Sequence, residues 1–124
     1  EVKEASYLLA DSYYRSSQWT KSLAQYKEIE AKQDQYYKKS VSRQAEIYST
    51  QKDYVNAIQY WNKVLPVATT NRDKANAWNG LMESYFETQK YDSCILVSQN
   101  LLANGTSTPE AENKALLYQG KSYY

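Results

Sequence analysis

Few residues of this chain are of the types that perform enzymatic chemistry. The sequence contains no histidine, the commonest general base and metal ligand in proteins, and Cys94 is its only cysteine. The three glycines, Gly80, Gly105 and Gly120, lie too far apart to form a loop that binds phosphate. The carboxylates remain, and they are read first as solvated side chains on helix faces. We therefore expect no enzymatic activity, no cofactor and no metal site, and we expect Cys94 to be a small buried side chain.

The composition also argues against a nucleic-acid ligand and against insertion of this segment into a membrane. The 124 residues carry a net charge of +1, and lysine and arginine are scattered rather than gathered in a basic stripe. Mean hydropathy is −0.83, and no apolar run approaches the roughly 18 residues that a membrane-spanning helix needs. We therefore expect a single domain over residues 1–124 whose function depends on its surface.

A four-residue pattern that ends in tyrosine occurs four times and indicates how that surface is built. The copies are Ala10-Asp11-Ser12-Tyr13, Ala45-Glu46-Ile47-Tyr48, Met82-Glu83-Ser84-Tyr85 and Gly120-Lys121-Ser122-Tyr123. Their tyrosines are separated by 35, 37 and 38 residues. Repeats of this length are typical of helical solenoids, in which each unit buries its apolar face against the next unit. We expect the four tyrosines to lie in the core.

Each of the first three units has a second half, so the sequence predicts two helices per unit. This half begins with an aromatic residue, Trp19, Tyr54 or Tyr91, and apolar residues then recur at helical spacing. We divide the chain into units at residues 2–34, 35–70 and 71–107 and a partial fourth unit at 108–124. The fourth unit ends as a single helix without a partner. We therefore expect the chain to be a fragment of a longer protein, or its last helix to self-associate.

The two patterns together resemble the tetratricopeptide repeat family, and the resemblance covers nearly the whole chain. The third unit carries Trp78, Leu81, Tyr85, Tyr91 and Leu101 in the family's order, and the second carries Ala45, Tyr48, Tyr54, Ala57, Trp61 and Val64. The family's glycine at the turn within each repeat is replaced here by Ser17, Lys52 and Gln89. The resemblance implies an all-α fold: a right-handed superhelical solenoid of antiparallel helix pairs, with about three and a half units.

The resemblance also implies which residues line the concave groove of such a superhelix. The family's groove positions correspond here to Tyr7, Asp11 and Tyr14, to Ser42, Glu46 and Ser49, and to Asn79, Glu83 and Phe86. Arg43 is the one cation at the positions by which the family's best-known groove grips a C-terminal carboxylate, so we do not expect that clamp here. Asp11, Glu46 and Glu83 would form a row of carboxylates. Such a row suits an extended segment that bears lysine or arginine, and the alternative is a solvated face.

We therefore expect a non-catalytic protein–protein interaction scaffold that binds a peptide or protein segment, basic in character, in the groove. The alternative is a structural spacer or self-assembly module, whose repeats stack on further repeats or on another copy. A receptor for a small molecule or glycan is a third hypothesis, and an enzyme is a fourth. The abundance of tyrosine, glutamine, asparagine and serine favours a bacterial cell envelope or periplasmic location, with the cytoplasm as the alternative.

Overall fold

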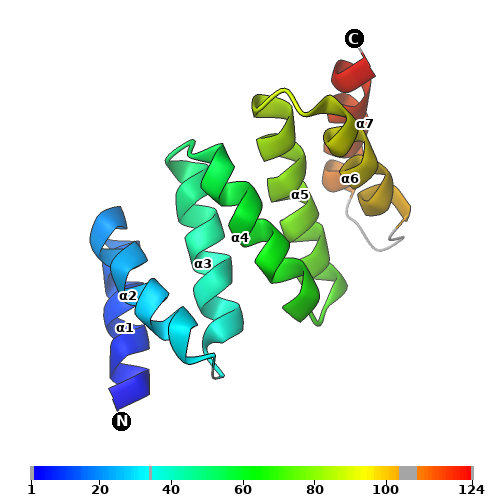
Figure 1. Ribbon diagram of the computed structural model, residues 1–124. Coiled ribbons are helices and arrows are strands. Elements are labelled where there is room, and N and C mark those ends of the chain that lie inside the picture. The colour runs from blue at the N-terminus through cyan, green and yellow to red at the C-terminus, as the bar shows by residue number, and fades with distance from the viewer. Residues whose placement is uncertain (1, 34, 104–108, 124) are drawn as a thin grey trace.

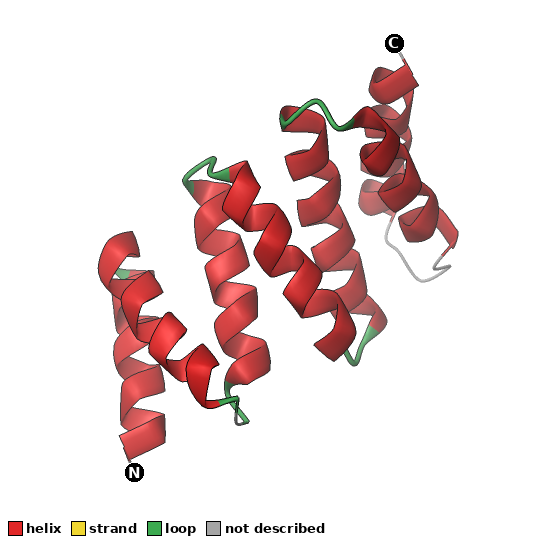
Figure 2. Ribbon diagram, in the orientation of Figure 1, coloured by secondary structure: helices red, strands yellow, loops and turns green. Residues whose placement is uncertain are grey.

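The computed structural model describes residues 2–33, 35–103 and 109–123, and within these ranges it consists of helices and turns (Figure 2). The helices are α1 (Val2–Arg15), α2 (Trp19–Lys32), α3 (Tyr37–Thr50), α4 (Tyr54–Val67), α5 (Asn71–Glu87), α6 (Tyr91–Ala103) and α7 (Pro109–Tyr123). No strand occurs in these ranges, which confirms the expected all-α fold. None of the helices described is both long and apolar enough to cross a bilayer. The expected unit boundaries at residue 34 and at residues 107 and 108 lie outside the described residues.

The helices pack in sequence order, each beside the one before it along the chain (Figure 1). In addition, the backbones of α3 and α5 lie close together, as do those of α5 and α7, whereas no two even-numbered helices approach as closely through their backbones in the part of the chain that is described. From α3 onward, the odd-numbered helices therefore form one connected layer, and α4 and α6 each pack between two of its members. This arrangement is compatible with a helical repeat.

The turns that join α1 to α2, α3 to α4 and α5 to α6 share one backbone geometry. Ser17, Lys52 and Gln89 adopt the left-handed conformation, with φ of 61°, 60° and 63°. The same hydrogen bond closes all three turns, from the amide of the next residue to the carbonyl of the recurring tyrosine: Gln18 to Tyr13, Asp53 to Tyr48 and Lys90 to Tyr85, at 2.8–2.9 Å. Glycine favours the left-handed conformation because it has no Cβ. The three left-handed residues are those that stand where the resembling family has glycine.

Two apolar clusters fill the space between the helices. The smaller joins α1, α2 and α3 around Tyr26, and the larger extends from α3 to α7. Tyr48 is buried in the larger cluster as expected, and Tyr13 and Tyr85 are half-buried. The prediction is wrong for Tyr123, which is 67% exposed, because no further helix of the described chain packs over this end of α7.

Within two of the helix pairs, a small side chain of the second helix bonds to the backbone of the first. The Ser22 hydroxyl donates to the carbonyl of Ala10 at 3.1 Å, and the Cys94 thiol donates to the carbonyl of Met82 at 3.4 Å. Ala10 and Met82 occupy the same position in the repeated pattern, so the two contacts are equivalent. Cys94 is fully buried, which confirms the prediction for its side chain, and this burial raises the pKa of its thiol.

Glu30 ties α2 to both α3 and α4. Its Oε1 accepts hydrogen bonds from the Gln44 amide and the Tyr60 hydroxyl, both at 3.0 Å, and its Oε2 lies 2.6 Å from Nζ of Lys63. Burial alone would raise the pKa of the Glu30 carboxyl, but the bonds from Lys63, Gln44 and Tyr60 outweigh burial and hold the pKa below its ordinary value. The first helix pair is therefore attached to the rest of the chain by a charged contact as well as by apolar packing.

Candidate functional site

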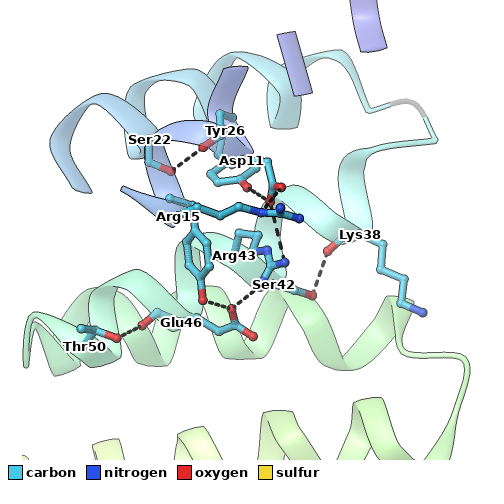
Figure 3. Close-up of polar contacts among 11 residues, drawn as sticks. Asp11, Arg15, Ser22, Tyr26, Lys38, Ser42, Arg43, Glu46 and Thr50 are labelled. Carbon is cyan, nitrogen blue, oxygen red and sulfur yellow. Dashed lines mark hydrogen bonds and ion pairs between the residues drawn. The ribbon is translucent and has the colours of Figure 1, made fainter. Parts of the chain in front are cut away.

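Three of the expected groove residues of α1 and α3, Asp11, Tyr14 and Glu46, meet around the guanidinium of Arg43. Figure 3 shows the contacts of Arg43 with Asp11 and Glu46. Nη1 of Arg43 lies 3.1 Å from Oε2 of Glu46, and Nη2 lies 3.7 Å from Oδ1 of Asp11. The guanidinium also stacks over the ring of Tyr14, with its carbon 4.4 Å from the ring centroid. Arg43 therefore brings together two of the three carboxylates that the sequence places in a row.

Both carboxylates have further partners, and together these groups form what we call the Arg43 network. Asp11 is only 9% exposed; its Oδ2 lies 3.0 Å from Nε of Arg15, and its Oδ1 accepts from the Tyr26 hydroxyl at 3.5 Å. Glu46 accepts a bond from the Tyr14 hydroxyl at 3.0 Å. Burial first, and the neighbouring carboxylate second, raise the pKa of Tyr14 and of Tyr26, so both hydroxyls remain protonated donors. Asp11 and Glu46 are thus both paired within the fold.

Glu83 belongs to a different group, made of aromatic side chains from α4, α5 and α7. Burial and then the charge of Glu83 raise the pKa of Tyr54 and of Tyr118, which places this carboxylate near both rings. Phe86 stands edge-on to Tyr118, with ring centroids 5.2 Å apart. Within the described ranges, no ion pair or hydrogen bond joins Glu83 to the Arg43 network.

Three other expected groove residues, Tyr7, Ser42 and Asn79, lie outside the Arg43 network. Tyr7 stacks on Tyr36 with ring centroids 5.1 Å apart, and the hydroxyl of Ser42 donates to the carbonyl of Lys38 in its own helix at 2.9 Å. Asn79 is half-buried, and its Oδ1 is buried without a hydrogen-bond partner. Of these three, Ser42 lines an open space.

That space is a pocket of about 360 Å³ between α3, α4 and α5. It is lined by Gln35, Lys38, Lys39, Ser42, Arg43, Glu46, Trp61, Val64, Asp73 and Asn76. Three of these, Ser42, Arg43 and Glu46, belong to the groove set expected from the sequence. The sequence reasoning missed the others as groove residues. The signal that could have found Lys38 and Lys39 is helical spacing, because they lie one turn before Ser42 and Arg43 on the same face of α3, whereas Gln35 lies in the turn before this helix.

The floor of the pocket is apolar and its geometry is held from two sides. Trp61 is 7% exposed, and its indole Nε1 donates to the hydroxyl of Ser49 at 3.0 Å. Gly80 of α5 makes room for the ring, because a Cβ at this position would lie 2.7 Å from Cδ2 of the indole and closer still to Cε2 and Nε1. The indole therefore lies directly against the backbone of α5. Val64, which is also buried, completes this floor.

Charged groups surround the floor. Nζ of Lys38 lies 2.7 Å from Oδ2 of Asp73 and 3.0 Å from the Thr69 hydroxyl, so Lys38 links α3 to α5. The bond from Lys38 holds the pKa of Asp73 below its ordinary value. Lys39, by contrast, is exposed and has no acidic partner among the described residues.

No protein-family model matches the sequence, and no match is found among curated proteins. Within the described ranges, no group of histidine, cysteine, aspartate or glutamate side chains is arranged to hold a metal ion. The functional interpretation therefore depends on the pocket and on the arrangement of the helices.

Proposed function

We propose that the chain is a non-catalytic protein–protein interaction scaffold, built of about three and a half tetratricopeptide-like repeats in a right-handed superhelix. It binds a peptide or protein segment along the odd-numbered helices. The observation that carries this proposal is the pocket, which lies between α3, α4 and α5 and borders three of the residues expected in the groove. The common turn geometry at Ser17, Lys52 and Gln89 supports the repeat on which the groove depends.

The pocket suits part of an extended segment. Its volume of about 360 Å³ is at the small end of the range of roughly 300–1,000 Å³ that ligand pockets occupy. An apolar floor with a polar rim is the usual arrangement where one side chain of a partner is anchored and its neighbours are held by hydrogen bonds. The row of carboxylates led us to expect a basic segment as the partner. Because Arg43 already engages Asp11 and Glu46, we keep the proposal of a contact with a basic side chain for Glu83 alone.

Selection from a displayed library of short random peptides, with the full chain immobilised, tests this function. Peptides that bind in the pocket should lose their affinity for Asn76→Trp, because Asn76 is an exposed lining residue and the indole would fill the space. Asn100→Trp is the matched control, since Asn100 is also an exposed helical asparagine but lies on α6. If the selected peptides bind both variants as they bind the parent, the pocket is not the binding site and the proposal fails.

Self-assembly is a second candidate, and the exposure of α7 favours it. Leu116 and Leu117 are 55% and 56% exposed on the last described helix, and adjacent apolar residues of this kind mark interaction surfaces. Sedimentation at rising concentration should show association that is abolished by the double change Leu116→Lys and Leu117→Lys. The control is Leu96→Lys on α6, where Leu96 is comparably exposed. A parent chain that sediments as a monomer throughout would contradict this candidate.

A further inference from the structure

We infer that the pocket between α3, α4 and α5 selects a segment in which an apolar residue lies next to an aspartate or glutamate. The inference depends on the proposed function, since it names the chemistry of the segment that the same pocket binds. It assigns the apolar side chain to the floor at Trp61 and Val64, and the carboxylate to Lys39 at the rim.

The charges around the pocket favour an acid. Five charged residues line it, of which Glu46 and Asp73 are acidic. Each acid is already paired within the protein, Glu46 with Arg43 at 3.1 Å and Asp73 with Lys38 at 2.7 Å. Lys39 is the remaining charge, and it has no acidic partner in the described part of the chain. An incoming carboxylate therefore meets a cation that is ready to pair.

A basic side chain would meet the opposite situation. To reach either acid, it would have to displace Arg43 or Lys38 from an existing contact, and it would approach Lys39 while doing so. Displacing Arg43 would also disturb its stacking on Tyr14. Like charges that are brought together at an interface suppress the wrong partner, so the pocket discriminates against lysine and arginine.

The neighbouring groups suit a carboxylate beside an apolar side chain. Gln35 and Asn76 are exposed at the rim, and each carries an amide that can donate to a carboxylate oxygen. The buried floor is preorganised, because the hydrogen bond to Ser49 and the backbone at Gly80 fix the indole of Trp61. A fixed apolar floor favours a side chain that fills it without rearrangement.

The test uses the same displayed library of short random peptides on the full chain. Selected peptides should be enriched in an apolar residue adjacent to aspartate or glutamate. Their affinity should fall about tenfold for Lys39→Glu, since attraction between exposed charges becomes repulsion, and the loss should shrink at high salt. Lys114→Glu is the matched control, because Lys114 is an exposed lysine of α7 and the change in net charge is the same. Replacing the acid of a selected peptide with glutamine should remove the difference between the parent and Lys39→Glu.

The outcomes separate the two proposals. Two results would overturn the acidic selectivity and leave the binding function intact. In the first, the selected peptides lose affinity for Asn76→Trp but are basic or uncharged. In the second, they lose affinity for Asn76→Trp but bind Lys39→Glu as tightly as they bind the parent chain. Peptides that ignore Asn76→Trp would overturn both.

Discussion

Replacing Gly80 with alanine should destabilise the fold, even though alanine is the better helix former. The added Cβ would lie 2.7 Å from Cδ2 of the Trp61 indole, whereas ordinary contacts of a Cβ begin near 3.4 Å. Either the indole moves by about an ångström and loses its bond to Ser49, or α4 moves away from α5. Overpacking of this kind costs about 1–3 kcal/mol and a lost hydrogen bond about 0.5–1.5 kcal/mol. The higher helix propensity of alanine offsets about 1 kcal/mol of this cost, so we expect Gly80→Ala to lower the free energy of unfolding by about 0.5–3.5 kcal/mol.

Gly120 provides the matched control within the same chain. It is also a helical glycine, but a Cβ added there would have no atom within 4 Å. Gly120→Ala should therefore raise stability by up to about 1 kcal/mol, from helix propensity alone. Urea unfolding followed by far-UV circular dichroism measures both free energies, and the two variants should shift the midpoint in opposite directions.

A double-mutant cycle identifies the indole as the cause. Trp61→Ala alone should cost about 3–5 kcal/mol, as other large-to-small changes in cores do, and in that background Gly80→Ala should be neutral or stabilising. The reasoning is refuted if Gly80→Ala alone stabilises the chain as Gly120→Ala does. A cost below about 1 kcal/mol for Trp61→Ala would likewise show that the indole is not packed between α4 and α5.

Three further predictions follow from single residues. Lys52→Gly should raise the free energy of unfolding by up to about 1 kcal/mol, because glycine removes the strain of a left-handed residue. Gln59→Gly, on an exposed helical face, should lower the free energy of unfolding by up to about 1 kcal/mol, so the two variants should shift the urea midpoint in opposite directions. The bonds to Glu30 hold its pKa below the ordinary value of 4.5 although burial opposes them. Their contribution is therefore complete above that pH and is lost as the pH falls through the lowered pKa, so Glu30→Gln should reduce the change in urea midpoint between about pH 7 and about pH 3. Cys94 should react with a thiol reagent no faster than the chain unfolds, since its thiol is fully buried and burial raises its pKa; rapid labelling of the folded chain would contradict this.

The helical framework could be predicted from the sequence because local chemistry repeats with it. Each recurring tyrosine up to Tyr85 supplies the carbonyl that closes the turn after its helix, so the pattern that marks the unit also marks where the helix ends. Burial was less predictable, because it depends on which helix comes next. Tyr48 and Tyr123 occupy the same position in the pattern, yet only Tyr48 has a following helix to cover it in the described chain.

The candidate site could be predicted only in part, because its contacts join residues that are distant in the sequence. The positions of Asp11 and Glu46 correspond in their units, and that correspondence suggested two equivalent free acids. The structure instead places Arg43 between them, and the Asp11–Arg43 contact spans 32 positions of the chain. A repeat pattern records what the units share, whereas this ion pair depends on a residue that only one unit has.

The position two residues before the start of the four-residue pattern differs between the units, and two of these differences shape the pocket. It is occupied by Leu8 in α1, by Arg43 in α3, by Gly80 in α5 and by Tyr118 in α7. In α3 the guanidinium neutralises the neighbouring acids, and in α5 the absence of a side chain lets Trp61 lie against the backbone. Arg43 therefore removes negative charge from the rim of the pocket, and the missing side chain at Gly80 determines the position of the Trp61 indole in its floor. Gly80→Ala, which adds a Cβ against the indole, should therefore lower the affinity for peptides as well as the stability of the fold. Gly120→Ala should leave the pocket and its affinity for peptides unchanged.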